Sequence, residues 1–179
     1  MANFILARAR RVVTSFALSA ALVFSVSAQA ADSPPEMIKS ESGIALSDTV
    51  DLHMCSQDGV AIDGYDLVSY RQVGGPVAGS AVNAVTYEGS TYLFVSKLNK
   101  ELFVKDPQRY LPAYSGFCAI TLALGRVTCP EYTNFKIEND KLLLFEVTGF
   151  TNGRTLWNSD SSNFRQQADT NFDRLLSRQ

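Results

Sequence analysis

The residues that most readily suggest chemistry lie side by side: His53, Met54 and Cys55 follow one another, and His53 is the single histidine of the protein. Imidazole, thioether and thiolate groups all suit a soft transition metal such as copper, so the three residues form a candidate metal site. A cluster this short also arises by chance, and its backbone would have to curl around the ion. The sequence therefore favours a structural role for these residues and leaves copper binding as the alternative.

Three cysteines, Cys55, Cys118 and Cys129, leave one thiol unpaired if the protein enters an oxidising compartment. A bridge between Cys118 and Cys129 would close a loop of about ten residues, which chain statistics permit, so spacing alone leaves the connectivity open. A free Cys118 could be a buried small hydrophobe, a redox-active thiolate or a metal ligand. Its sequence neighbours are apolar or aromatic and the nearest base is Arg126, so burial is the favoured interpretation.

Groups for catalysis are sparse. A single histidine cannot complete a Ser-His-Asp set within a folded core if it lies in a mobile segment, and no CxxC pair is present for thioredoxin-like exchange. A non-catalytic protein is the favoured class. A thiol-dependent redox protein that uses Cys118 is the alternative.

The first 30 residues have the features of a secretory signal peptide. Arg8, Arg10 and Arg11 precede an apolar run over 16–26, and Ala28-Gln29-Ala30 is a small-x-small cleavage pattern. We expect a soluble periplasmic or secreted protein with no membrane span after cleavage, because the apolar run is about half the length needed to cross a bilayer. Cleavage leaves 13 basic and 18 acidic residues, a net charge of about −5, which argues against a nucleic-acid partner.

The remaining chain fits one domain. Residues 31–52 are rich in serine, proline and acidic residues without a sustained period, which indicates a flexible lead-in, and 53–179 form the single domain. No internal repeat is evident in the sequence.

A hairpin followed by a helix is expected at the centre of this domain. Apolar and polar residues alternate over 85–94 on both sides of a turn at Glu88-Gly89. Ser96 stands where a helix N-cap belongs, and Pro107 disfavours helical geometry at Asp106, so we expect a short helix between them.

A second hairpin is expected over 135–145, with its turn at Asn139-Asp140 and an apolar, central strand over 141–145. Residues 164–176 carry an apolar stripe at helical spacing after possible caps at Ser161 and Ser162. The expected fold class is α+β: one antiparallel sheet built from the two hairpins, with the short helix and a C-terminal helix packed on it.

These central residues resemble the YHS-domain family, and specifically its longer exported subclass. The resemblance covers roughly residues 60–173 and implies the fold more specifically than the function. The matching residues are Ala61–Asp66, Val68, Tyr70, Tyr92, Phe94, Ser96, Phe103, Asp106, Pro107, Tyr110, Pro112, Tyr114, Gly116, Cys118, Ala119, Gly125, Phe135, Lys141, Leu142, Trp157 and Ala168–Asn171.

The resemblance also bears on the cysteines and on metal binding. Cys118 matches a family cysteine whereas Cys55 and Cys129 do not, which implies that the latter two pair and Cys118 remains a thiol. In metal-associated members, cysteine or histidine stands near the position of Ser96. Here Val95 and Asn99 replace those ligands, and neither offers a soft donor.

We therefore expect an exported binding or accessory module that takes a small ligand or a metal ion. Gly116 allows a ligand or another chain segment to approach closely, which makes a pocket plausible beside Tyr114. For Asp66 the expected role is to bond nearby backbone amides, and facing the pocket is the alternative. The candidate pocket residues are Tyr65, Asp66, Ser96, Asn99, Tyr114 and Cys118.

Overall fold

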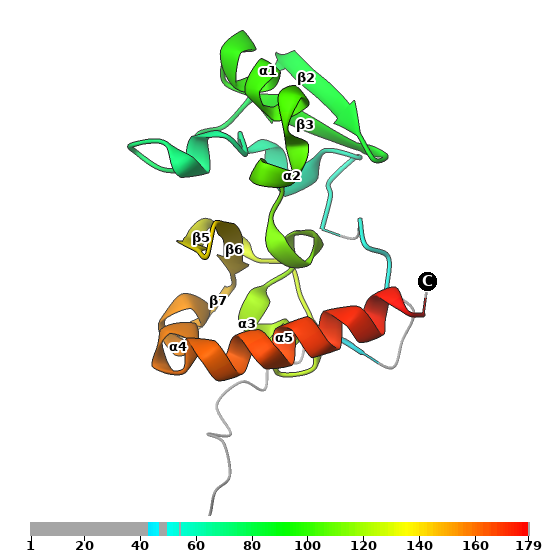
Figure 1. Cartoon of the computed structure of the whole chain (residues 1–179), viewed down its shortest axis with the longest axis vertical. Helices are drawn as coiled ribbons and strands as arrows, with labels where there is room; N and C mark the ends of the chain where they lie inside the picture. The colour runs from blue at the N-terminus through cyan, green and yellow to red at the C-terminus, as the bar shows by residue number, and fades with distance from the viewer. Residues whose placement is uncertain (1–42, 47–49, 54, 179) are drawn as a thin grey trace, which may run out of the picture. The chain divides into compact units, whose positions relative to one another are not determined.

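The computed structural model describes residues 43–46, 50–53 and 55–178. The expected signal peptide, most of the expected lead-in and Met54 lie outside these residues. The α+β class is confirmed, with helices beside antiparallel hairpins (Figure 1). The helical and strand segments run in this order: β1 Ile44–Ala45, η1 Ala61–Gly64, η2 Ser69–Arg71, β2 Ser80–Tyr87, β3 Ser90–Phe94, α1 Lys97–Lys105, α2 Pro107–Tyr110, η3 Ala113–Gly116, α3 Ala119–Ala123, β4 Arg126–Val127, β5 Glu131–Glu138, β6 Lys141–Phe145, β7 Val147–Thr148, β8 Thr151–Asn152, α4 Gly153–Ser159 and α5 Ser161–Leu176.

Local signals place the expected elements well. Ser96 caps α1 by accepting a hydrogen bond from the backbone N–H of Asn99, and the helix ends before Asp106 as expected. Pro107 then opens α2, because its missing N–H costs nothing at the first position of a helix. In the C-terminal helix the cap is Asp160 rather than Ser161 or Ser162, and its side chain accepts from the N–H of Asn163.

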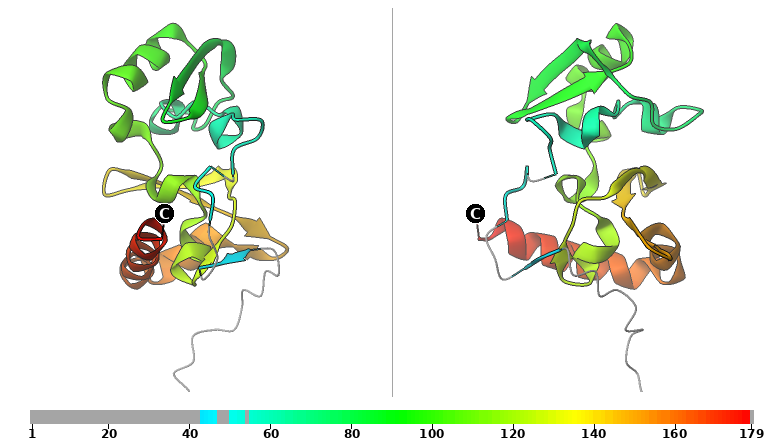
Figure 2. Two further views of the ribbon diagram at one scale, coloured as in Figure 1. Left: turned by 90° about the vertical axis from the view of Figure 1, so that its right-hand side faces the viewer. Right: turned by 180° about the vertical axis from the view of Figure 1, so that it is seen from behind.

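The two long hairpins do not join in one sheet. β2 pairs only with β3, and β5 pairs only with β6, so the described strands form four separate two-stranded sheets. Figure 1 shows β2, β3 and α1 gathered at one end and α3, α4 and α5 at the other, and Figure 2 shows the same separation from two further sides. The single sheet expected from the sequence is therefore wrong, although both hairpins form.

Strand β6 explains this arrangement. Its side chains alternate between two apolar clusters: Leu142 and Leu144 belong to one, and Leu143 and Phe145 to the other. We call the first cluster, which contains Phe94 and Phe103, the N-terminal core, and the second, which contains Trp157, the C-terminal core. A strand buried on both faces needs a continuous apolar run, as the sequence of β6 has.

The same order of structural elements occurs twice in the described chain. η1, the β2–β3 hairpin and α1 are followed by η3, the β5–β6 hairpin and α4. Both 3₁₀ segments contain left-handed residues and end in a glycine, Gly64 or Gly116. Both hairpins carry a register shift at the same place, between Ser80 and Ala84 in one and between Glu131 and Phe135 in the other.

Equivalent hydrogen bonds also occur within each of the two halves. In each, a buried side chain after the left-handed turn accepts the N–H of the residue just past the hairpin: Val95 to Asp66 Oδ2 at 2.9 Å, and Glu146 to Cys118 Sγ at 3.2 Å. In each, a hydroxyl donates to the carbonyl of that same residue, Ser69 to Asp66 at 2.6 Å and Thr121 to Cys118 at 3.1 Å. The structure thus reveals an internal repeat that the sequence analysis missed, because within 61–66 only Ala61 and Gly64 have identical counterparts.

The domain begins earlier than residue 53. β1 pairs with β4, and Leu46 and Val50 are buried in the C-terminal core. The described residues of the expected lead-in therefore belong to the fold. Polar composition concealed them because a two-residue strand and two buried side chains make no periodic pattern.

Candidate functional site

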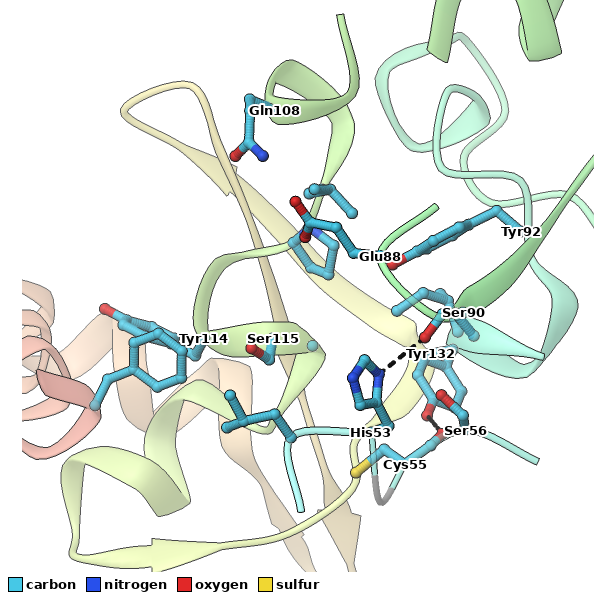
Figure 3. A pocket seen from close by; sticks show the side chains of 17 residues that line it. His53, Cys55, Ser56, Glu88, Ser90, Tyr92, Gln108, Tyr114, Ser115 and Tyr132 are labelled. Atoms are coloured by element: carbon cyan, nitrogen blue, oxygen red, sulfur yellow. Dashed lines mark hydrogen bonds between the residues drawn. The ribbon is translucent and has the colours of Figure 1, made fainter. Parts of the chain in front are cut away.

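A cavity of about 380 Å³ lies where several connections meet (Figure 3). Its walls come from the segment before η1, from η1 itself, from the turn of the β2–β3 hairpin with the start of β3, and from α2, η3, β5 and α5. The residues that line it are Leu52, His53, Cys55, Ser56, Ala61, Ile62, Glu88, Ser90, Tyr92, Gln108, Leu111, Pro112, Tyr114, Ser115, Gly116, Tyr132 and Phe172. Its size suits a small molecule.

Two left-handed turns, one from each half of the repeat, meet at this cavity. Ile62 has φ of 54°, and Tyr114 and Ser115 have φ of 56° and 54°. Such angles are uncommon for residues with a Cβ and unusual for β-branched isoleucine. The turns touch: a Cβ on Gly116, whose φ is 83°, would lie 3.1 Å from Ile62 Cδ1. Glycine at 116 therefore serves both the backbone angle and the close approach.

The segment before η1 forms the N-terminal wall of the cavity with Leu52, His53, Cys55 and Ser56, and three contacts hold it in place. Cys55 and Cys129 form a disulfide with Cα atoms 5.4 Å apart, and Cys118 is a free, buried thiol, which is the pairing implied by the resemblance. The Tyr132 hydroxyl donates to the Cys55 carbonyl at 2.8 Å. His53 Nδ1 lies 2.9 Å from Ser90 Oγ, the hydrogen bond drawn in Figure 3. These contacts hold His53 at the cavity.

Burial keeps the cavity's phenols protonated. It raises the pKa of Tyr92, helped by the negative charge of Glu88, and it raises the pKa of Tyr132 to about 12. The pKa of Tyr114 is also raised by burial and by its hydrogen bond to Asp169, whose Oδ1 accepts from the Tyr114 hydroxyl at 2.8 Å. At neutral pH all three side chains are therefore neutral.

Of the six predicted pocket residues, only Tyr114 lines this cavity. Asp66 and Asn99 are buried in a separate hydrogen-bonded cluster on the β2–β3 side of the chain. Asp66 Oδ1 accepts from the N–H groups of Val68 and Ser69 at 2.8 and 3.3 Å, while Oδ2 accepts from Val95 N–H and from Asn99 Nδ2 at 2.9 and 2.7 Å. The expected amide-bonding role of Asp66 is confirmed.

The other three predicted residues have local roles. Ser96 caps α1, and half-buried Tyr65 packs against the N-terminal core. Cys118 is 0% exposed, and its pKa is raised by burial although hydrogen bonds from Thr121 and Glu146 oppose the shift. A redox role for Cys118 therefore lacks both access and a thiolate.

The donors do not fit a metal ion. The Cys55 sulfur is bonded in the disulfide, and Met54 lies outside the described residues. Of the three predicted ligands, His53 is therefore the one that the structure describes with a donor not bonded in the disulfide. At the family's ligand positions, Val95 offers only its amide, and the Asn99 side chain donates to Asp66. Nowhere in the described part of the chain do three or more histidine, cysteine, aspartate or glutamate side chains gather around a possible ion.

Sequence reasoning missed Glu88, Ser90, Tyr92 and Tyr132. The first three lie in or just after the turn of the β2–β3 hairpin, so the hairpin pattern alone accounted for them. One available signal could have found Tyr132: if Cys55 pairs with Cys129, then His53 must lie near the residues that begin β5.

Comparisons with models of protein families, with curated proteins and with solved structures found no match. Within the ranges that the structure describes, none of the helices combines the length and the apolar character needed to cross a bilayer.

Proposed function

We propose that this chain is an exported, YHS-like binding or accessory module that holds a small ligand in the cavity beside His53 and performs no catalysis. The signal-like pattern of the first 30 residues and the resemblance to the exported YHS subclass support the exported setting. The cavity supports the binding role, since it is built by parts of both halves of the repeat and by the disulfide-linked segment.

The observation that carries the proposal is the number of strained backbone positions at the cavity. Four of the eight non-glycine residues with positive φ in the described chain line it: Ile62, Glu88, Tyr114 and Ser115. Conformations of this kind cost on the order of 1–3 kcal/mol each and tend to collect at ligand clamps. Folding stability alone would favour glycine or asparagine at these places.

The groups present support the non-catalytic part of the proposal. His53 is the only histidine, and its Nδ1 is engaged with Ser90. Cys55 is oxidised, and Ser90 is the one lining serine hydrogen-bonded to the imidazole. Among the described residues, no carboxylate is hydrogen-bonded to the His53 ring to orient it as a base.

The proposal is tested by an NMR screen of the mature protein against a library of small polar and aromatic fragments. We expect hits that shift the amide signals of Ser90, Tyr92 and Ser115 and that vanish in Ser56→Trp, which fills the cavity from its half-buried rim. Glu101→Trp, on the exposed face of α1, is the matched control and should bind like the parent.

Circular dichroism and thermal melting would first establish that both variants fold. Hits that shift other surfaces only, or that survive in a folded Ser56→Trp protein, would show that the cavity is not the binding site.

A further inference from the structure

The charges around the cavity have one sign. Among its described lining residues there is no lysine or arginine, and Glu88 is the one carboxylate. His53 also lines the cavity, and its Nδ1 is hydrogen-bonded to Ser90. A phosphate or carboxylate ligand would find no lysine or arginine among the described lining residues to pair with.

Two tyrosine hydroxyls at the cavity add hydrogen-bond acceptors to the negative charge of Glu88. The Tyr132 and Tyr114 hydroxyls donate their protons to Cys55 and Asp169, so their oxygens can face the cavity only as acceptors. Asp169 adds a second negative charge behind Tyr114. The nearby Arg165 is paired with Glu138, a carboxylate that also pairs with Lys136. The site therefore offers acceptors and negative charge to a ligand.

Aromatic rings supply the rest of the wall. Tyr92, Tyr114, Tyr132 and Phe172 all line the cavity, and Tyr114 and Phe172 meet edge to face with centroids 5.6 Å apart. Figure 3 shows Glu88 and Tyr92 on one side of the space and Tyr114 with Ser115 on the other. The faces of such rings attract positive charge.

We propose that the cavity binds a small organic cation, an ammonium or quaternary ammonium compound whose charge lies near Glu88 and Tyr92. This inference rests on the proposed function and names the ligand class of the same site. A primary ammonium group would donate hydrogen bonds to the Glu88 carboxylate and the tyrosine oxygens. A quaternary group would rely on the ring faces and on the carboxylate charge.

The test is calorimetric and NMR titration of the mature protein with four probes: choline, ethanolamine, the neutral choline isostere 3,3-dimethylbutan-1-ol, and inorganic phosphate. We expect at least one cation to bind about tenfold more tightly than the neutral isostere, and phosphate not to bind. Added salt should weaken cation binding, because Glu88 is exposed.

Two variants locate the charge and distinguish the two kinds of cation. Glu88→Gln should lower cation affinity about three- to tenfold and leave the neutral isostere unaffected. Glu101→Gln, an exposed glutamate on α1, is the control and should change nothing. Tyr92→Phe should weaken ethanolamine while sparing choline, because it removes a hydroxyl and keeps the ring.

The outcomes separate this inference from the proposed function. If the isostere or phosphate binds at the cavity as well as the cations do, or if Glu88→Gln has no effect, the cation assignment is wrong while the cavity remains a binding site. If neither cation shifts the Ser90 and Tyr92 signals at about 10 mM, where a millimolar site would be filled, the cation assignment fails. Failure of the fragment screen as well would overturn the proposed function.

Discussion

At the scale of single residues, Asp66 and Cys118 occupy equivalent places in the two halves. Each is fully buried, and its side chain accepts a hydrogen bond from the backbone N–H of the residue that follows the second strand of its hairpin. A buried donor without a partner would cost about 1–3 kcal/mol, so each place requires an acceptor, and either a carboxylate or a thiol meets that requirement. Hydrogen bonding and burial are thus sufficient to explain the thiol of Cys118.

We predict that Cys118 is unreactive in the native protein. A thiol reagent at neutral pH should add nothing to the oxidised protein and exactly one label after unfolding, measured by intact mass, because the other two cysteines are bonded to each other. Rapid native labelling at Cys118 would instead support the redox alternative.

The raised pKa of Cys118 has a pH consequence with a definite sign. Its stabilising effect is complete below the unfolded pKa of about 9 and is lost as the pH rises through the higher folded value. The stability advantage of the parent over Cys118→Ala should therefore fall above about pH 9, by at most about 1.4 kcal/mol per pH unit, in urea unfolding. A difference that grows with pH would contradict this.

At the scale of elements, local sequence signals located the hairpins and α1 but not the cavity. The Ser96 cap, the Pro107 stop and the two turns act within a few residues and can be recognised from residue types. The amide-bonding role of Asp66 could be anticipated, whereas its partners Val95 and Asn99 lie 29 and 33 residues away. The cavity depends on the Cys55–Cys129 bridge across 74 residues, and no local pattern specifies such a contact.

We predict that this disulfide holds the N-terminal wall of the cavity. The double variant Cys55→Ser with Cys129→Ser should lose about 2–4 kcal/mol of unfolding free energy, since the bridge closes a long loop. Chymotrypsin should then cleave after Leu52 under native conditions, as it should in the reduced parent protein. Reductant should have no further effect on the double variant, which serves as the control.

Unchanged resistance at Leu52 after reduction would mean that the His53–Ser90 and Tyr132–Cys55 hydrogen bonds hold the wall without the bridge.

At the scale of the whole described fold, two cores share β6. A continuous apolar strand indicates burial on both faces, but the sequence does not say what covers each face. One sheet containing both hairpins was the simplest interpretation. It is wrong because the hairpins do not pair with each other, and the two faces of β6 pack into different cores. The internal repeat was also not evident from the sequence, because the two halves have equivalent hydrogen bonds and strand register but few identical residues.

We predict that a destabilising substitution in one core also lowers the unfolding midpoint of the other. Leu142→Ala, in the N-terminal core, and Leu143→Ala, in the C-terminal core, should each cost about 2–5 kcal/mol. Trp157 is the only tryptophan and reports on the C-terminal core, so its fluorescence midpoint in urea should fall in both variants together with the circular dichroism midpoint. Ile137→Ala, on the partly exposed face of β5, is the control and should cost much less.

Separate midpoints for fluorescence and circular dichroism in Leu142→Ala would show that the cores unfold independently.

The shared strand also limits how the protein can open. Strand β6 pairs with β5 along one edge, and at Leu142 and Leu144 it forms bridges with Pro112 and Cys118. Its side chains are enclosed on both faces, so we expect solvent to reach its backbone amides only when both cores open. Their hydrogen exchange should therefore follow global unfolding, whereas helices at either end can fray on their own. We therefore expect two halves alike in construction to unfold as a single cooperative unit, with the slowest-exchanging amide protons on the strand that both cores share.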